Sequence, residues 1–259
     1  MKTIVFLNIK GGVGKSSSVT TIAHMLATIY KKRVLIADLD PQGNASTMFS
    51  SVDYVSMLLG KEAEQEVYSM EDLLSDPELD PNECISHTKY EGLDIIPAYL
   101  TLAEAEERIK AVTFEPQQFK LRNQLDKIRD KYYYCIIDCS PSLSILNINA
   151  LVAADEVYIP MTVDGGSLMG AKAVQNIVKN VKKYNQGRPH IAGAFFVRYD
   201  DTKNVSRSSA EIFNTIMPEV ELFPIYTHVS KSLEENTWMQ MPLLELDTEI
   251  GRASCRERV

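Results

Sequence analysis

One segment of the sequence carries the residue types that bind phosphate groups. Residues 10–17 read KGGVGKSS, and they lie between a short apolar run and a stretch with helical spacing. Glycines let backbone N–H groups close around phosphate oxygens, and the N-terminus of a following helix adds its positive dipole. Lys15 can bring a cation to the β- and γ-phosphates of a nucleotide, and the Ser16 hydroxyl can ligate Mg²⁺. The structural alternative is a glycine-rich turn with a chance Lys-Ser pair.

The segment departs from the strict phosphate-loop pattern, G-x-x-x-x-G-K-[ST], at its first position. Ile9 stands where the pattern has a glycine, and Lys10 comes immediately before the glycine pair. The strand-like run before the segment and the helical pattern after it are the context that a phosphate loop requires. The residues that we expect to contact a nucleotide here are Gly11, Gly12, Val13, Gly14, Lys15, Ser16 and Ser17.

Carboxylates follow two other apolar runs. Asp38 and Asp40 come after the run at residues 34–37, and Asp138 comes after the run at residues 133–137. Phosphoryl transfer needs positioning and charge neutralisation more than covalent chemistry, and a carboxylate on a loop at a strand end suits the positioning of a water molecule. Helix N-caps after strands are the alternative interpretation of Asp38 and Asp138.

The rest of the chain alternates between continuous apolar runs, which fit parallel strands covered on both faces, and amphipathic stretches, which fit the covering helices. We expect strands at residues 3–8, 33–38, 93–97, 133–138, 156–161, 190–197 and 222–225, and helices at residues 16–30, 116–131, 168–184 and 205–217. Residues 51–92 hold acidic clusters and prolines, and we interpret them as short surface helices and loops. The alternation predicts an α/β fold with one doubly wound, mostly parallel sheet flanked by helices.

The composition is that of an ordinary globular protein, since 45% of the 259 residues are hydrophobic and 24% are charged. A net charge of -8 excludes a protein that coats nucleic acid over its whole surface, although a local basic patch remains compatible with it. The sequence has no secretory signal and no apolar stretch near the roughly 20 residues of a membrane span, so we expect a cytoplasmic protein. The four cysteines do not form a disulfide framework, and we interpret Cys135 and Cys139 as buried thiols.

Three boxes at strand ends resemble those of one family. KGGVGKSS resembles the deviant Walker A box of the ParA/MinD group of P-loop ATPases. Residues 38–46, DLDPQGNAS, resemble the DxDPQGN switch segment of ParA/Soj partition ATPases, and residues 136–143, IIDCSPSL, resemble the family's IIDTPPSL. The resemblance extends over the chain to residue 248 and implies a P-loop NTPase fold of the deviant Walker A type.

The resemblance implies catalytic roles for Lys10, Lys15 and Asp40. Lys10 is the signature lysine, which in the family reaches across an ATP-bound dimer to the partner's phosphates, where a second cation stabilises the bond being broken. Lys15 binds the β- and γ-phosphates of its own nucleotide, and Asp40 orients the attacking water. The Mg²⁺ ligands that the resemblance implies are Ser16, Asp38 and the Walker B carboxylate Asp138.

Basic residues are concentrated in the C-terminal half, where ParA dimers bind DNA without sequence preference. On an acidic protein this concentration suggests a one-sided patch, although solvated helix faces explain Lys179, Lys182 and Lys183 equally well. Lys203 and Lys231 are the candidates for DNA contacts, because they lie near where the family carries DNA-contacting arginines. The residues that would border the adenine are Arg198, Pro224 and Ile225.

The function that the resemblance implies is an ATP-dependent DNA-partitioning ATPase associated with the nucleoid. ATP and Mg²⁺ would close a homodimer, the dimer would bind DNA non-specifically, and a ParB-like partner would stimulate an otherwise weak hydrolysis. No helix-turn-helix precedes the loop, so operator reading would fall to that partner. The alternatives are a MinD-like ATPase that binds membrane through a C-terminal amphipathic helix, and a scaffold that uses ATP only to dimerise. The DPQGN sequence favours the ParA type, and Lys10 with Asp40 argues against the scaffold.

The last ten residues do not fit the rest of the chain. Residues 250–259 read IGRASCRERV, lack helical or strand periodicity, and match the translation of a widely used sequencing-library adapter. We interpret them as a foreign end, with a genuine basic tail as the alternative. Residues 1–249 are then expected to be a single P-loop ATPase domain that is truncated at its C-terminus. Without the ten residues, 24 basic residues stand against 34 acidic ones, a net charge of -10.

Overall fold

The structure is a computed structural model that describes residues 1–50, 68–200, 202–227 and 242–246. Lys231 and the adapter-like residues 250–259 lie outside the described residues. The strands in chain order are β1 (Lys2–Phe6), β2 (Val34–Leu39), β3 (Ser86–His87), β4 (Leu93–Ile96), β5 (Tyr134–Cys139), β6 (Glu156–Met161), β7 (His190–Phe196) and β8 (Leu222–Tyr226). The helices are α1 (Lys15–Thr28), α2 (Asn44–Phe49), α4 (Met70–Ser75), α5 (Leu102–Ala111), α6 (Lys120–Asp126), α7 (Ile145–Ala153), α8 (Gly165–Tyr184), α9 (Asn204–Ile216) and α11 (Leu243–Leu246), with 3₁₀ turns η1 (Pro81–Cys84) and η2 (Gln117–Phe119).

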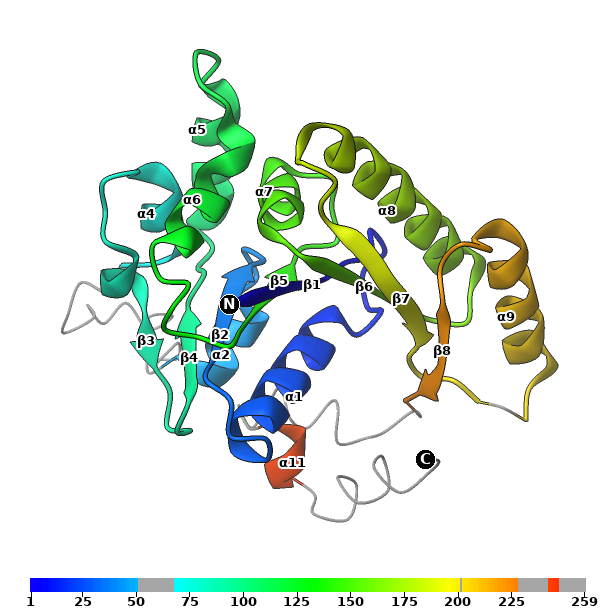
Figure 1. Cartoon of the computed structure of the whole chain (residues 1–259). Coiled ribbons are helices and arrows are strands. Elements are labelled where there is room, and N and C mark those ends of the chain that lie inside the picture. The colour runs from blue at the N-terminus through cyan, green and yellow to red at the C-terminus, as the bar shows by residue number, and fades with distance from the viewer. Residues whose placement is uncertain (51–67, 201, 228–241, 247–259) are drawn as a thin grey trace.

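The described strands form one sheet in the order β3-β4-β2-β5-β1-β6-β7-β8 (Figure 1). Every neighbouring pair is parallel except β3 with β4. This confirms the α/β fold with a doubly wound, mostly parallel sheet. The chain leaves β1 toward β2 on one side and places β6, β7 and β8 on the other. Ligands of such sheets bind outside the carboxyl ends of the strands where the order reverses, which here is the end of β1.

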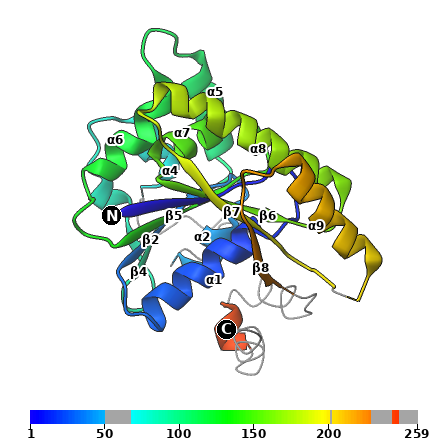
Figure 2. The same ribbon diagram turned by 45° about the vertical axis from the view of Figure 1, so that its right-hand side comes forward.

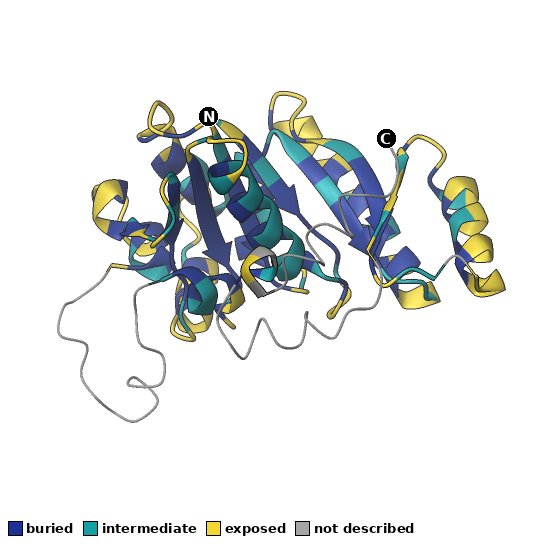
Figure 3. Cartoon of the chain, turned by 90° about the horizontal axis from the view of Figure 1, so that it is seen from below, coloured by how far each residue is buried: buried dark blue, intermediate teal, exposed yellow. Residues whose placement is uncertain are grey.

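The hydrophobic core has one cluster on each face of the sheet. On one face, Val19 and Ala23 of α1 pack with Ile36 of β2, and α2 joins them. On the other face, Leu35 of β2 and Val174 of α8 belong to a larger cluster that also takes in α4 to α7 and α9. Figure 2 shows α1 on one side of the sheet and α5, α7 and α8 on the other. The strands are largely buried and the outer helix faces exposed (Figure 3), as continuous apolar runs predict.

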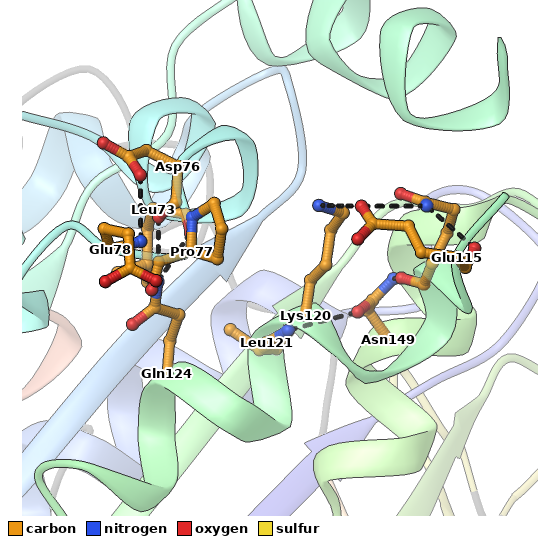
Figure 4. Close-up of polar contacts among 10 residues, drawn as sticks. Leu73, Asp76, Pro77, Glu78, Glu115, Lys120, Leu121, Gln124 and Asn149 are labelled. Atoms are coloured by element: carbon orange, nitrogen blue, oxygen red, sulfur yellow. Dashed lines mark hydrogen bonds and ion pairs between the residues drawn. The ribbon is translucent and has the colours of Figure 1, made fainter. Parts of the chain in front are cut away.

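Helix α4 belongs to the core. Met70 and Leu73 are buried on it, with at most 1% exposed. Gln124 of α6 donates from Nε2 to the carbonyl oxygens of Asp76 (3.0 Å) and Pro77 (3.3 Å) just beyond α4 (Figure 4). The short helices expected in this part of the chain are present as α4 and η1, and the apolar face of α4 packs on the main sheet, but the prediction of helices and loops alone is wrong at β3, which pairs with β4 at the edge of the sheet.

The helix expected at residues 116–131 is shorter than predicted. Asn149 of α7 accepts the Leu121 amide (3.1 Å) and donates to the Gln117 carbonyl (2.9 Å), so that a 3₁₀ turn precedes α6 (Figure 4). Beyond α6 the backbone bonds span three residues rather than four, as at the Lys131 amide. A side chain from another helix thus sets where α6 begins.

Candidate functional site

The three boxes predicted from the sequence meet at one edge of the sheet. Phe6 of β1 and Asp38 of β2 are both paired in register with Asp138 of β5, so these three strands end side by side. A cavity of about 390 Å³ opens at this edge. Its lining residues that the sequence analysis expected are Gly11, Gly12, Gly14, Lys15, Ser16, Ser17, Asp40 and Arg198. Those it missed are Thr20, Gln42, Asn44, Thr47, Met48 and Pro141.

The loop between β1 and α1 adopts a conformation that requires glycine. Gly12 and Gly14 have φ angles of 73° and 76°, in the left-handed region. A Cβ atom on Gly14 would also lie 3.3 Å from Cγ1 of Val197, so the loop closely approaches the residue that follows β7. No side chain caps the N-terminus of α1 and its first turn holds no acidic residue, which leaves its backbone N–H groups for an anion. The Val13 side chain is fully buried and is not part of the lining.

Lys15 is the buried cation of the cavity, with only 6% of the residue exposed. Its Nζ donates to the carbonyl oxygen of Lys10 at 3.2 Å. Burial lowers the pKa of Lys15, while the charges of Asp138, Cys139 and Asp40 oppose this shift. A desolvated ammonium group is stabilised by an anionic partner, and a phosphate group in the cavity would be one.

Asp138 is fully buried, and neither carboxylate oxygen has a hydrogen-bond partner within the described residues. Burial and then the neighbouring Asp38 raise the pKa of Asp138 well above its usual value, while Ser16 and Lys15 act in the opposite direction. Unpartnered buried carboxylates are rare in native proteins, and a divalent cation is the partner that hard oxygen ligands prefer. The Asp138 carboxylate with the Ser16 hydroxyl therefore fits Mg²⁺.

Asp38 is equally buried but differs from Asp138 in having partners for both oxygens. Its Oδ1 accepts the Asp40 amide at 3.0 Å, and its Oδ2 accepts the amide and the hydroxyl of Ser46 at 2.9 and 2.7 Å. Burial raises the pKa of Asp38 to about 6, against the hydrogen bonds from Ser46 and Asp40. These bonds hold the start of α2 to the end of β2. The Mg²⁺ role of Asp38 stays a prediction.

Asp40 lines the cavity and is 5% exposed. Its Oδ1 accepts the Gln42 amide at 3.0 Å, and its carbonyl oxygen accepts the Gly43 amide at 2.8 Å. Gly43 has a φ of 60° and starts α2 directly after this turn. The carboxylate thus lies on a tight turn next to Lys15, as a water-positioning role requires.

Lys10 is not part of the cavity lining. Its Nζ forms an ion pair with Oδ1 of Asp164 at 2.7 Å, and Asp164 is the N-cap of α8 through the Ser167 amide (3.0 Å). Burial by itself would raise the pKa of Asp164, but hydrogen bonds from Lys10, Thr162 and Ser167 outweigh it and lower the pKa to about 2. The lysine is therefore held on the outer side of the loop. Asp164 was missed by the sequence analysis, although an Asp before two glycines at a helix start is an N-cap signal.

Asn8 ties the loop to α8. Its Oδ1 accepts the Lys10 amide at 3.1 Å, and its Nδ2 donates to the Pro160 carbonyl at 2.9 Å and the Ser167 carbonyl at 3.3 Å. A Cβ on Gly170 of α8 would lie 2.1 Å from Asn8 Oδ1, so only glycine allows this approach. This close contact with Asn8 is the physical reason for a glycine at position 170.

The residues expected at the adenine are only partly brought together. Arg198 lines the cavity at the end of β7 and has a φ of 55°, an uncommon value for a residue with a side chain. Pro224 and Ile225 are exposed on the edge strand β8 and are not among the residues lining the cavity. Their contact with a base stays a prediction.

Several basic residues of the C-terminal half bond within the chain. Lys179 pairs with Glu219 at 2.8 Å, and Arg188 with Asp155 at 2.7 Å. Lys203, whose side chain is 65% exposed, lies just before α9 and pairs with its near neighbour Asp200 at 3.2 Å. Among the described residues, no helix has both the length and the apolar character needed to cross a membrane.

Comparison with known proteins agrees with this geometry. The AAA_31 family model, described as an AAA domain, matches residues 1–191. The sporulation initiation inhibitor protein Soj of Bacillus subtilis is 35% identical over 226 residues, which are 84% of this chain and 84% of the relative. The chromosome-partitioning ATPase Soj of Treponema pallidum is 34% identical, over 84% of this chain and 83% of the relative.

The fold is also found in solved structures. Apo McdA of Cyanothece superposes with a TM-score of 0.80 at 22% sequence identity, and the match covers 95% of this chain and 93% of McdA. The sheet order, the glycine loop after β1 and the Soj relatives all indicate the same family. The chain belongs to the ParA/Soj group of the ParA/MinD family of P-loop ATPases.

Proposed function

We propose that the chain is a DNA-partitioning ATPase that hydrolyses ATP to ADP and phosphate with Mg²⁺. One observation carries the proposal. A left-handed glycine loop, the buried Lys15 and Asp40 line one cavity of about 390 Å³ at the ends of three neighbouring strands, and the fully buried Asp138 lies at the same strand ends without forming part of the lining. The Soj relatives support the role in partition.

Phosphate binding, Mg²⁺ binding and the positioning of water would each be the role of different residues. The loop amides and Lys15 would bind the phosphates, because both present N–H donors at the cavity. Ser16 and Asp138 would hold Mg²⁺, which when bound neutralises phosphate charge. Asp40 would accept a hydrogen bond from a water molecule and orient its oxygen toward the γ-phosphate.

Lys10 would act on the nucleotide of a second copy of the chain. It lies outside its own cavity, and exposed apolar side chains occur on the segments beside it. Leu143, which follows β5, is 66% exposed, and Met169 in the first turns of α8 is 75% exposed. An ATP-bound homodimer would bury this face and bring each Lys10 to the phosphates of the partner.

Asp164→Asn is expected to lower the ATP concentration at which the homodimer forms. Asparagine can still cap α8, but it loses the charge that holds Lys10. Because the two side chains are 41% and 37% exposed, the ion pair contributes at most about 1 kcal/mol, which corresponds to a shift of up to about fivefold. Sedimentation across an ATP titration measures the shift, with Asp126→Asn as the control for a remote surface ion pair. An unchanged midpoint would show that Asp164 does not restrain Lys10.

Lys203→Glu combined with Lys231→Glu is expected to weaken binding to random-sequence DNA and to leave ATP binding intact. A plot of log affinity against log salt concentration has a negative slope, and each lost phosphate contact makes this slope shallower by about 0.9. Filter binding at several salt concentrations with ATP gives this slope. Lys179→Glu with Lys183→Glu changes the net charge equally and is the matched control. Equal loss in both pairs would mean that net charge sets the affinity for DNA and that Lys203 and Lys231 have no specific role.

A comparison of two surfaces tests the partition role. The chain is mixed with random-sequence DNA or with anionic liposomes, each with ATP and with ADP. ATP-dependent binding to DNA supports a nucleoid-associated partition ATPase whose hydrolysis a ParB-like partner stimulates. ATP-dependent binding to liposomes alone would instead identify a MinD-like protein that positions a complex at the membrane.

A further inference from the structure

Ser46 joins two segments behind the nucleotide cavity. Its hydroxyl donates to Oδ2 of Asp38 at 2.7 Å, and the same hydroxyl oxygen accepts the backbone amide of Ala98 at 2.8 Å. Its own amide donates to the same Asp38 oxygen at 2.9 Å. Ser46 is fully buried, and Ala98 lies two residues beyond the end of β4. One side chain therefore connects the end of β2, the helix α2 and the segment beyond β4.

The two faces of α2 have different surroundings. Asn44, Thr47 and Met48 line the cavity, whereas Ala45 and Ser46 are buried on the side of the sheet. A helix of six residues has little stability of its own and depends on tertiary bonds for its position. The bonds of Ser46 thus hold α2 in place without any contact between Ser46 and the cavity.

The turn that carries Asp40 is attached to the same anchor. The Asp40 amide donates to Oδ1 of Asp38 at 3.0 Å, and the other oxygen of Asp38 is the one held by Ser46. At its far end the turn closes on Gly43, the first residue before α2, whose amide donates to the Asp40 carbonyl at 2.8 Å. Both ends of the turn are therefore fixed by elements that Ser46 bonds.

We infer that Ser46 is a positioning residue for ATP hydrolysis, which holds Asp38 and α2 so that Asp40 faces the nucleotide. The inference rests on the proposed function, because it assigns Ser46 a part in hydrolysis. A hydroxyl can donate and accept at once, so alanine loses both side-chain bonds, whereas threonine keeps them. Because Ser46 does not line the cavity, its replacement leaves the phosphate contacts in place.

Turnover and ATP affinity of three variants test the inference. Ser46→Ala is expected to lower kcat about tenfold or more and to change ATP affinity by less than about twofold, since a small misplacement of a catalytic group slows chemistry by up to about 100-fold. Ser46→Thr restores kcat. Ser50→Ala, at the C-cap directly after α2, keeps wild-type turnover, because the buried Ser50 hydroxyl has no hydrogen-bond partner within the described residues. An unchanged kcat in Ser46→Ala, or a parallel loss of ATP affinity, would overturn the positioning role.

Hydrogen exchange without nucleotide supplies a readout that does not depend on activity. In Ser46→Ala the amides of Asp40 and Ala98 are expected to exchange faster, while β1 keeps its protection. Should Ser46→Ala fail to fold, Ser46→Cys, which keeps the volume but bonds weakly, takes its place. Unchanged exchange at Asp40 overturns the inference. A wild-type chain without ATP turnover would contradict the proposed function, whereas the exchange result would still decide whether Ser46 holds the turn.

Discussion

Replacing Lys15 with alanine should reduce ATP affinity by a factor on the order of 100, because hydrogen bonds to charged groups contribute about 1.5–3 kcal/mol each. Lys15 is the buried cation of the cavity, and its Nζ has one neutral acceptor at 3.2 Å, the Lys10 carbonyl. Burial lowers its pKa, so its charge lacks full compensation until an anion enters. Calorimetric titration with ATP measures the loss.

The matched control for this substitution is Lys127→Ala. Lys127 also donates to a backbone carbonyl, that of Pro77 at 2.9 Å, but it is exposed and remote from the cavity. Its replacement should leave ATP affinity unchanged. Wild-type ATP affinity in Lys15→Ala would contradict the assignment of residues 10–17 as a phosphate loop.

Asp40→Ala should keep ATP bound and slow its hydrolysis by about 100-fold or more, the range in which positioned acid–base groups contribute. The ATP-bound homodimer should then accumulate, since release depends on hydrolysis. Asp40→Asn sharpens the test, because its side-chain oxygen can still accept the Gln42 amide and the turn stays intact. Phosphate release measures turnover, and size-exclusion chromatography with ATP measures the dimer.

Asp126→Ala serves as the control for Asp40, because Asp126 is a surface carboxylate paired with Arg129 at 3.0 Å and is not part of the cavity. It should hydrolyse ATP at the wild-type rate. Unchanged turnover in both Asp40 variants would remove Asp40 from the mechanism. Turnover lost in Ala but kept in Asn would assign it a purely structural role in the turn.

The described strands other than the two-residue β3 could be predicted closely from the sequence. β6 begins at Glu156 and ends at Met161 as expected, and β2 and β5 are each displaced by one residue. A continuous apolar run bounded by polar residues leaves a buried strand little freedom in its position. The helix α7 was missed because six of its nine residues are buried, so it shows no amphipathic stripe.

The residues of the candidate site also fall into two groups, those that a local sequence pattern predicts and those that it does not. Asp40 directly follows β2, Asp138 is the second-last residue of β5, and Lys15 begins α1 after the glycine loop, so local sequence patterns indicate all three. Asp164 bonds to Lys10 across 154 residues, and Ser46 bonds to the Ala98 amide across 52. These roles depend on which segments the fold brings together, and no local pattern shows them.

The attachment of α8 to the glycine loop has a mechanical consequence. Asn8 bonds the loop to the first turn of α8, a helix of 20 residues and thus about 30 Å long. If α8 rotated as a rigid body by about 10° about its first turn, Tyr184 at its far end would move by about 5 Å, because the helix is about 30 Å long. Lys172 of α8 donates to the Ile216 carbonyl at the end of α9 (2.7 Å), so α8 is also bonded to the helix that Lys203 precedes. Hydrogen bonds at Asn8 and Lys172, joined by one straight helix, thus connect the phosphate loop to the end of α9.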